Sequence, residues 1–343
     1  MNSFQQIKQD IQAKPRRWLV TGVAGFIGSN LLETLLELDQ EVAGLDDFST
    51  GSPSNLEEVR RKVGAAKFAR FRLIEGDVCD PAKSAAALKG AELVLHQAAN
   101  GSVLHSIEDP LASNASNVTG HLTLLHQASR GGVQRFVYAS SSAVYGDDEA
   151  TSKTEAQIGR QLSPYGVTKY VNELYADTLG RLTGLGTVGL RYFNVFGPRQ
   201  DPNGAYAAVI PTWIFAMMRG DDVRVFGTGE TTRDFCHVQD VVQANLLAAL
   251  TERPEAIGQV YNIALGQRTS LNQLFAVLCK SLQGRYPRLA TLKPVYHPFR
   301  PGDVLYSLAD IGLARRLLGY EPTHSLEQGL AETLDWYQQS LAG

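Results

Sequence analysis

The sequence has few of the residues that mark specialised classes of protein. Its three cysteines, Cys79, Cys236 and Cys279, are scattered among 343 residues, so we expect neither a disulfide framework nor a bound metal. The formal net charge is −3 and no basic cluster is present, which argues against a nucleic-acid partner. No apolar run is long enough to span a bilayer, and the polar first residues lack the apolar centre of a signal peptide. We therefore expect a cytoplasmic protein without a membrane partner.

What the chain does have is an alternation of short apolar runs with stretches of helical spacing. Leu31, Leu32, Leu35 and Leu36, for example, are spaced as on one face of a helix. This alternation predicts an α/β fold, with a doubly wound parallel sheet of the Rossmann type covered by helices on both faces. The expected strands are 16–21, 41–46, 71–77, 92–97, 135–140 and 186–191, and helices are expected near 106–130 and 164–183.

Three parts of the chain differ in composition. Residues 1–16 form a polar N-terminal extension, and residues 17–196 carry the alternation of strands and helices. Residues 197–343 are less regular and richer in proline, which predicts a smaller C-terminal lobe that is rich in loops. Within that lobe, "QVYNIA" at 259–264 is expected to return to the main sheet.

A glycine-rich segment, "VTGVAGFIGSN" at 20–30, follows the first strand and opens the first long helix. Gly22 permits the tight turn, Gly25 lets a pyrophosphate approach the backbone, and Gly28 lets helix and strand pack closely. With Phe26 and Ile27 between the last two glycines, the segment predicts a phosphate cradle at a helix N-terminus. The alternative is a glycine-rich turn that binds no ligand.

The strand after the cradle ends in a carboxylate, Asp46. An acid at that place suits the hydroxyls of an adenosine ribose, which predicts NAD as the cofactor. Asp47, together with the absence of Arg and Lys from 40 to 59, would repel the 2′-phosphate of NADP. Asp77 and Val78 end the next strand, where they either line the adenine pocket or simply form a turn.

A possible proton-handling pair occurs in "SPYGVTKY" at 163–170. Tyr165 and Lys169 are four residues apart and would share one face of a helix. A nearby ammonium lowers the pKa of a phenol, and the positive charge of a nicotinamide ring would act in the same direction. Tyr165 would then serve as a general base near neutral pH. A Tyr and a Lys that merely share a helix face are the simpler interpretation if the motif is taken alone.

Further motifs occur around this pair, and in this order they resemble the extended short-chain dehydrogenase/reductase family over nearly the whole chain. Within that family the chain looks most like nucleotide-sugar 4-epimerases, particularly those of UDP-N-acetylglucosamine. The motifs are TGxxGFIG at 21–28, "HQAA" at 96–99, "YASSSAVYGD" at 138–147, YxxxK at 165–169, "LRYFNVFGPRQ" at 190–200 and "RDFCHVQD" at 233–240.

The resemblance implies a role for individual residues. Tyr165 would take the proton from the sugar O4, Ser141 would hydrogen-bond O4, and Lys169 would hold the nicotinamide ribose. Residues 17–196 would form the NAD-binding domain and residues 197–343 the UDP-sugar-binding lobe. Gln97 and Tyr192 would also contact NAD; Ser142, Asn194, Ala208, Val209, Phe226, Arg233, Arg300, Asp303 and Ser307 would contact the UDP-sugar. The resemblance also implies a homodimer joined through the helices near 106–130 and 164–183.

Two small residues favour epimerisation over the dehydration that other members of the family perform. Dehydratases resemble this chain but carry an Asp-Glu pair where Ser142 and Ala143 precede "VYGD". Elimination would lack its proton carriers here, so a transient 4-keto sugar would take the hydride back on its other face. At Ser307, epimerases restricted to glucose and galactose often have a bulky tyrosine. Serine would leave room for an N-acetyl group, unless Ser307 is only the N-cap of a following helix.

Several alternatives remain open at this level. Asn100, Leu104, His105, Leu305 and Tyr306 depart from the usual pattern of the subgroup in segments expected to border the sugar. The substrate could therefore be UDP-glucose and UDP-galactose alone, or an N-acetylated UDP-hexuronic acid. A protein of another class, a NAD-binding sensor without catalysis, would be free to lose Ser141, Tyr165 or Lys169, and this chain retains all three.

Overall fold

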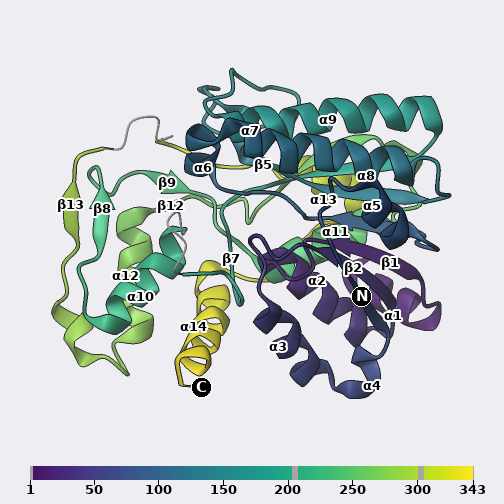
Figure 1. Ribbon diagram of the computed structural model, residues 1–343. Helices are drawn as coiled ribbons and strands as arrows, with labels where there is room; N and C mark the ends of the chain where they lie inside the picture. The colour runs from purple at the N-terminus through teal and green to yellow at the C-terminus, as the bar shows by residue number, and fades with distance from the viewer. Residues whose placement is uncertain (1–2, 203–207, 300–304, 343) are drawn as a thin grey trace.

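A computed structural model of the protein describes residues 3–202, 208–299 and 305–342. Its centre is a seven-stranded sheet in the order β11-β6-β5-β4-β1-β2-β3, and every neighbouring pair is parallel (Figure 1). The predicted Rossmann-type architecture is thereby confirmed. The strands are β1 (Arg17–Thr21), β2 (Glu41–Asp46), β3 (Phe71–Glu75), β4 (Leu93–His96), β5 (Arg135–Ser141), β6 (Gly186–Tyr192) and β11 (Gln259–Ile263).

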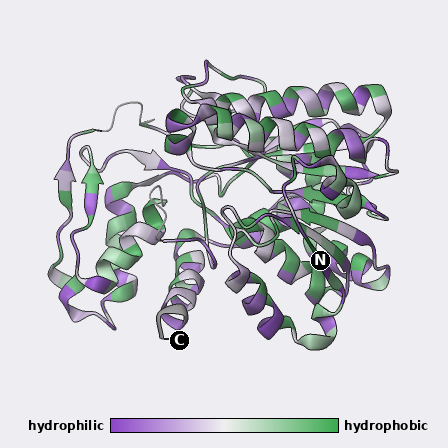
Figure 2. Ribbon diagram, viewed as in Figure 1, coloured by the Kyte–Doolittle hydropathy of each residue, from purple (hydrophilic) through white to green (hydrophobic). Residues whose placement is uncertain are grey.

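Each face of the sheet is covered by its own hydrophobic core. On one face lie α1 (Ser3–Ala13), α2 (Phe26–Glu37), α11 (Val238–Leu250) and α13 (Gly312–Leu318). On the other face lie α5 (Pro81–Leu88), α8 (Gly120–Ala128) and α9 (Pro164–Thr183). Hydrophobic residues concentrate in the sheet, between the two helical layers, and in α11 of one layer (Figure 2). The four leucines spaced along α2 are fully buried there.

The N-terminal extension is a packed element. Phe4 and Ile11 of α1 are buried in the same core as α2, and α1 contacts α11. The apolar residues of α1 lie on one side of the helix, and this side packs against the helices that cover the sheet. The sequence analysis recognised the polarity of residues 1–16 and missed this apolar face.

The helical stretch expected near 106–130 is divided. Pro110 starts a new helix because its ring cannot continue the preceding one, and Asp109 caps that helix by accepting from the amide of Ala112 at 2.9 Å. The stretch becomes α6 (Val103–Glu108), α7 (Pro110–Asn114), a π-helical turn (Ala115–Thr119) and α8.

The C-terminal lobe has a third core, formed by α10 (Val209–Arg219), α12 (Leu271–Leu282), α14 (Leu326–Ala342) and β8 (Arg224–Phe226), and β13 (Val295–His297) pairs with β8. The expected return of "QVYNIA" to the main sheet is confirmed, because β11 pairs with β6. The remaining elements are α3 (Pro53–Val63), α4 (Ala65–Phe68), β7 (Val195–Phe196), β9 (Thr232–Arg233), β10 (Cys236–His237), β12 (Thr269–Ser270) and the 3₁₀ turns Ser142–Tyr145, Pro254–Ala256 and Pro287–Thr291.

Two expectations about the whole chain concern cysteine and the membrane. Cys79, Cys236 and Cys279 are free thiols. Within the described ranges, none of the helices combines the length and the apolar character needed to cross a bilayer.

Candidate active site

A cavity of about 1310 Å³ lies at the carboxyl ends of the central strands. The strand order reverses between β1 and β4, which is where ligands bind in sheets of this kind. Most of the residues predicted from the sequence meet at this cavity. They are Gly22, Gly25, Phe26, Ile27, Gly28, Asp46, Asp77, Val78, Gln97, Ser141, Ser142, Tyr165, Lys169, Tyr192, Asn194, Arg233 and Ser307.

The glycine-rich segment forms one end of the cavity. Gly22 has φ +64, and a Cβ there would lie 2.8 Å from the backbone nitrogen of Ala98. At Gly28 a Cβ would lie only 2.0 Å from the carbonyl oxygen of Gly22, so helix and turn touch through backbone alone. No side chain caps α2, whose N-cap residue is Gly25. The first-turn amides of α2 are therefore available to a phosphate.

Asp46 stands beside this cradle and is tied to it. Its carboxylate accepts from the amide of Ala24, at 2.8 Å, and from the amide of Phe48, at 2.9 Å. Burial raises the pKa of Asp46, and the two amide hydrogen bonds act in the opposite direction. Asp47 and Asp77 line the same end of the cavity. The basic residues of the described lining come from other elements and are Lys153, Lys169 and Arg233.

These features fit NAD. The bare backbone of the cradle matches a pyrophosphate, and the carboxylates at the ends of β2 and β3 match ribose hydroxyls while opposing a 2′-phosphate. Asp77 also accepts from the amide of Cys79 at 2.8 Å, so it lines the cavity and forms a turn at once.

A buried hydrogen-bond network supports the middle of the cavity. The hydroxyl of Tyr192 donates to Gln97 Oε1 at 3.1 Å and accepts from Asn245 Nδ2 at 2.9 Å. Gln97 Nε2 donates to Asn245 Oδ1 at 3.1 Å, which closes the triangle. Burial raises the pKa of Tyr192, so this phenol stays protonated. Asn245 lies on α11, far along the chain, and sequence analysis did not identify it.

Tyr165 lies in the first turn of α9, and Ser141 ends β5. Ser163 caps α9 by accepting from the amide of Gly166 at 3.1 Å, and the amide of Tyr165 donates to Ser106 Oγ at 3.0 Å. The hydroxyl of Ser141 is near enough to the phenol of Tyr165 to lower its pKa, and both side chains line the cavity. The geometry thus places a phenol and a hydroxyl side by side, where both can reach one substrate oxygen.

Lys169 is buried one turn further along α9. Its Nζ donates to the carbonyl oxygen of Ala139 at 2.9 Å and lies 5.8 Å from the centre of the Tyr165 ring. Burial lowers the pKa of Lys169 to about 8. Burial also raises the pKa of Tyr165, which the Ser141 hydrogen bond partly offsets. The chain alone therefore favours a neutral phenol at Tyr165. The sequence analysis expected Lys169 to lower the pKa of this phenol, and the structure shows the opposite direction. A further positive charge is needed to make Tyr165 a base.

A buried ion pair fixes α9 against the sheet behind these residues. Glu173 pairs with Arg191 Nη2 at 2.7 Å and with its Nε at 2.9 Å, and the hydroxyl of Ser140 donates to Glu173 at 2.5 Å. Arg191 also lies 4.9 Å from the ring centre of Tyr145. The pair holds α9 in register with β5 and β6, and so holds Tyr165 in register with Ser141.

Asn117, in the π-helical turn, is another buried polar residue near the site. It accepts from the amide of Asn100 at 2.7 Å and donates to the carbonyl oxygen of Asn100 at 3.0 Å. Its Nδ2 also donates to Thr168 Oγ1 at 3.1 Å, and Thr168 donates to the carbonyl oxygen of Tyr165 at 2.8 Å. Sequence analysis did not identify Asn117. Its position inside an apolar helical pattern is the signal that could have identified it.

The lobe side of the cavity contains fewer of the predicted residues. Asn194 donates to the carbonyl oxygen of Asp234 at 3.1 Å, and Arg233 Nη1 donates to that of Thr232 at 2.9 Å. Phe226 lies outside the described lining, beside the His297 ring at 5.5 Å between ring centres. Ala208 and Val209, at the start of α10, also lie outside it, and Arg300 and Asp303 fall outside the described residues.

Residues that depart from the family pattern occur in two segments, and only one of these segments lines the described cavity. Asn100, Leu104 and His105 line the cavity. Leu305 and Tyr306 are 46% and 54% exposed and do not belong to its described lining.

Ser307 lines the cavity and is half-buried. The following helix, α13, begins at Gly312 with Ile311 as its N-cap. The alternative explanation of Ser307 as a helix cap is therefore wrong.

Comparisons with known proteins agree with this geometry. The chain is 34% identical over 329 residues to a UDP-glucose 4-epimerase of Mycolicibacterium smegmatis, covering 94% of this chain and 98% of that protein. A crystal structure of UDP-glucose 4-epimerase from Thermotoga maritima with UDP-glucose is similar with a TM-score of 0.85 at 36% identity, over 95% of this chain and 99% of that one. A UDP-N-acetylglucosamine 4-epimerase from Methanobrevibacter ruminantium M1, in complex with UDP-N-acetylmuramic acid, has a TM-score of 0.86 at 34% identity with the same coverage.

The family model described as "NAD dependent epimerase/dehydratase family" matches residues 18–264, which include the whole cradle, Asp46, Ser141, Tyr165 and Lys169. The chain therefore belongs to the NAD-dependent epimerase/dehydratase family, and NAD is its cofactor.

Proposed function

We propose that this protein is a nucleotide-sugar 4-epimerase that interconverts UDP-N-acetylglucosamine and UDP-N-acetylgalactosamine. The observation that carries the proposal is that Tyr165 and Ser141 line one cavity together with Ser142 and Ala143, the small residues that the resemblance puts at the positions of a dehydratase's acid and base. Among the described residues that line the cavity, the carboxylates are Asp46, Asp47 and Asp77, all at the cradle end. Elimination of water beside Tyr165 would therefore lack a carboxyl proton carrier, whereas epimerisation needs none.

The tasks of the individual residues follow from their positions. Tyr165 takes the proton from the sugar O4 and later returns it, while the Ser141 hydroxyl orients O4 toward the phenol. Bound NAD supplies hydride acceptance and return, together with the positive charge that the buried phenol needs. Lys169, fixed by the carbonyl of Ala139, is placed to hold the nicotinamide ribose. The 4-keto sugar turns within the cavity between the two hydride transfers, so C4 is inverted without net redox change.

The lobe side would hold the UDP part of the substrate. Asn194 and Arg233 line the cavity from adjacent segments, and an arginine fork suits phosphate oxygens. Arg300 and Asp303, from the resemblance, would complete the contacts to the diphosphate and the ribose. Three further residues expected to contact the nucleotide do not line the described cavity, so their roles stay predictions: Phe226, Ala208 and Val209.

The size of Ser307 favours an N-acetylated substrate. Its small side chain lines the cavity without the bulk that would oppose a group on the sugar C2. The relative from Methanobrevibacter ruminantium M1 is named for UDP-N-acetylglucosamine, which supports this choice. The relatives named for UDP-glucose favour the plain hexose pair as the second candidate.

A hexuronic acid would require a cation for its carboxylate. Lys153 is buried and ion-paired with Asp148 at 3.0 Å, and Lys169 already donates to Ala139. Both lysines of the described lining are therefore engaged, which makes a uronic acid the weaker alternative.

The test is incubation of the purified chain with UDP-N-acetylglucosamine, UDP-glucose and an N-acetylated UDP-hexuronic acid, followed by separation of the C4 epimers. We expect the highest kcat/KM for the N-acetylhexosamine and slower turnover of UDP-glucose. A 4-keto-6-deoxy product would instead identify a dehydratase. Absence of turnover with all three, while NAD stays bound, would favour the sensor alternative.

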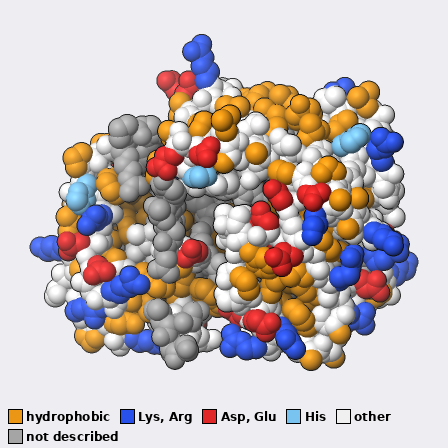
Figure 3. All heavy atoms as spheres, in the orientation of Figure 1, with side chains coloured by type: hydrophobic (Ala, Val, Ile, Leu, Met, Phe, Trp, Pro, Cys, Tyr) orange, Lys and Arg blue, Asp and Glu red, His pale blue; other side chains and the backbone are white. Residues whose placement is uncertain are grey.

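We also propose that the protein is a homodimer. Exposed apolar side chains gather on α7 and α9, where Figure 3 shows hydrophobic atoms along the upper edge of the molecule. Leu111 is 81% exposed and Leu182 76%, which are large values for leucines on helices. Burial of these side chains against a second copy would remove them from water. Light scattering should give twice the chain mass of 37.4 kDa, and Leu182→Glu should shift it toward the monomer, whereas the distant control Val295→Glu should not.

A further inference from the structure

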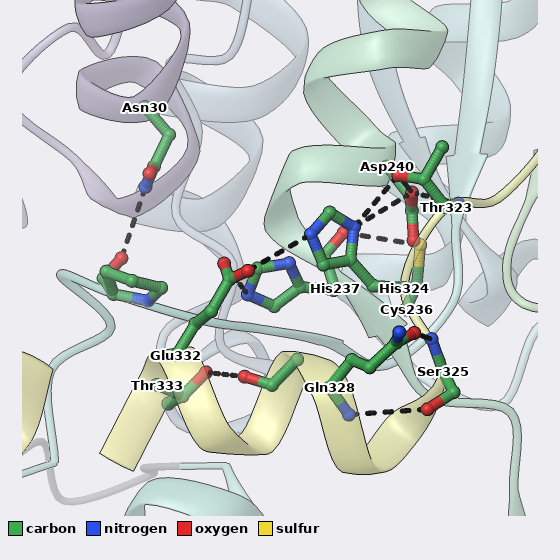
Figure 4. Close-up of polar contacts among 12 residues, drawn as sticks. Asn30, Cys236, His237, Asp240, Thr323, His324, Ser325, Gln328, Glu332 and Thr333 are labelled. Atoms are coloured by element: carbon green, nitrogen blue, oxygen red, sulfur yellow. Dashed lines mark hydrogen bonds and ion pairs between the residues drawn. The ribbon is translucent and has the colours of Figure 1, made fainter. Parts of the chain in front are cut away.

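A cluster of potential metal ligands lies outside the cavity, at the junction between α11 and α14. It contains His237, which ends β10 and is the N-cap residue of α11, His324, which precedes α14, and Glu332 on α14. One potential ligand atom from each lies within 4.8 Å of the others. In Figure 4 the two imidazoles and the Glu332 carboxylate converge from three segments. None of the three residues lines the cavity.

His237 has an unusual environment for a buried polar side chain. It is 2% exposed, and neither Nδ1 nor Nε2 has a hydrogen-bond partner. Its Nε2 lies 4.0 Å from Glu332 Oε2, too far for a hydrogen bond. Buried polar atoms in proteins are nearly always satisfied, so an unpartnered imidazole nitrogen aimed at a carboxylate indicates a missing ligand.

The ring of His237 is held firmly in this position. It packs against the rings of Phe196 and His324, at 5.4 Å and 4.5 Å between centres. Gly329, one turn before Glu332 on α14, leaves space for it, since a Cβ at Gly329 would lie 2.9 Å from His237 Cδ2. The close approach of α14 at this glycine is what brings Glu332 to the two histidines.

His324 is oriented by a second carboxylate. Its Nδ1 lies 3.4 Å from Asp240 Oδ1, and its Nε2 lies 3.4 Å from Glu332 Oε1. Asp240 is itself fixed, because its Oδ1 accepts from the amide and the hydroxyl of Thr323 at 2.7 and 2.9 Å. A carboxylate behind a histidine, which leaves the other ring nitrogen free to coordinate, is the usual outer-shell arrangement of protein zinc sites.

We propose that His237, His324 and Glu332 bind one Zn²⁺ ion. Two imidazoles and one carboxylate form a donor set that zinc takes with a further position left to water. Ligand atoms of a tetrahedral zinc site lie about 3.3–3.4 Å apart, given zinc–nitrogen distances of about 2.0–2.1 Å. His324 Nε2 lies 3.4 Å from Glu332 Oε1, which already meets this value, and His237 Nε2 lies 4.0 Å from the other carboxylate oxygen, Oε2. The side chain of Glu332 is 55% exposed, so a small movement can bring its carboxylate to both rings. The sequence suggested no metal, because only its cysteines were considered as ligands.

The position of the ion gives it a structural task. β10 pairs with β7, which directly follows Asn194, and Arg233 lies four residues before His237. An ion held by His237, His324 and Glu332 would therefore tie the segment that carries Arg233 to the C-terminal helix α14. It would act by stiffening the lobe side of the cavity, and no chemical step would pass through it.

The test is metal binding by the untagged full-length chain after treatment with a chelator. With Zn²⁺ added and the excess removed, elemental analysis should give one zinc per chain, and the thermal unfolding midpoint should rise. Co²⁺ in its place should produce the visible absorption of a four- or five-coordinate site. Mg²⁺ and Ca²⁺, which prefer oxygen ligands, should neither bind nor displace zinc.

Variants of His324 and Glu332, the two ligands that are not fully buried, separate the site from general packing. His324→Gln and Glu332→Gln should each weaken zinc binding at least about 10-fold, in line with losses seen for altered metal shells. The matched controls are His126→Gln on α8 and Glu327→Gln on α14, both exposed, which should bind zinc as the parent does. Substoichiometric zinc in the parent chain would overturn the proposal, as would equal affinity in the ligand variants and the controls. Because the readout is metal content, the result is independent of which sugar the enzyme uses.

Discussion

The two ends of the cavity are built from different kinds of contact. At the cradle end the chain offers backbone, through the turn at Gly22, the packing at Gly28 and the open amides of α2, and a single carboxylate fixed by two amides. At the sugar end it offers side chains, with Tyr165 from α9, Ser141 from β5, and Arg233 and Ser307 from the lobe. The first end comes from residues close in sequence, whereas the second is assembled from segments far apart.

The two ends should therefore tolerate different substitutions. Backbone contacts allow no substitution that adds atoms, because neither a turn nor a helix can yield locally. Side-chain contacts can be altered singly, so the sugar end can change its chemistry or its substrate while NAD stays bound. Four predictions test this separation.

The largest effect should follow removal of the proton carrier at the sugar end. Tyr165→Phe keeps the ring and its packing but deletes the hydroxyl, so turnover should fall about 10²–10⁴-fold. The cradle end should be unaffected, and the purified variant should release as much NAD(H) on denaturation as the parent. Tyr175→Phe, also on α9 but 39% exposed, is the matched control. Turnover close to the parent's would mean that Tyr165 is not the base.

The second prediction concerns a substitution at the cradle end, which should affect NAD binding. Gly28→Ala would place a Cβ 2.0 Å from the Gly22 carbonyl oxygen, so α2 would have to move away from the turn. We expect loss of copurifying NAD and a fall in the free energy of unfolding of about 1–3 kcal/mol, as for overpacked sites. Gly284→Ala, where a Cβ would meet nothing within 4 Å, should leave both quantities unchanged. Retention of NAD by Gly28→Ala would contradict the assignment of this turn as the phosphate cradle.

A smaller effect is expected from a change of size at the sugar end. Ser307→Tyr should lower kcat/KM for UDP-N-acetylglucosamine and spare that for UDP-glucose, because the new ring would occupy the space of the N-acetyl group. The ratio of the two should change by about 10- to 200-fold, the range of single contacts in a pocket. Equal losses with both sugars would show that Ser307 does not gate the C2 substituent.

The fourth prediction is a pH dependence of stability that arises from Lys169. Its pKa falls from 10.5 to about 8 in the folded protein, so between these values the unfolded chain binds more protons. The free energy of unfolding should therefore rise with pH across that interval, by at most about 1.4 kcal/mol per pH unit. Denaturant titrations should find that Lys169→Met loses this rise. The buried tyrosines contribute equally to the pH dependence of the parent and of the variant, so their contribution cancels in the difference.

The exposed lysine of α12, Lys280, provides the control for this last experiment. Lys280→Met should keep the parent's pH dependence, since its ammonium stays in water. Parallel curves for the parent and Lys169→Met would mean that Lys169 keeps its charge in the folded state.

Much of this protein follows from local sequence patterns. Strand β2 occupies the predicted residues 41–46, α9 occupies 164–183, and the cradle stands at the start of α2 as predicted. These features depend on spacing along a strand or a helix and on the special conformations of glycine, which neighbouring residues impose on each other directly. The Tyr165 and Lys169 pair could be recognised for the same reason, since one helical turn joins its members.

The tertiary structure decided what depends on burial and on contacts between distant segments. Asn245 reaches Tyr192 and Gln97 only after α11 packs on the sheet, and His237 meets His324 and Glu332 only where Gly329 lets α14 approach. The protonation of Tyr165 belongs to the same class, because the burial that raises its pKa comes from packing. Local spacing specifies which groups a segment carries, but the solvent exclusion and the partners that set their chemistry arise only when the layers close around them.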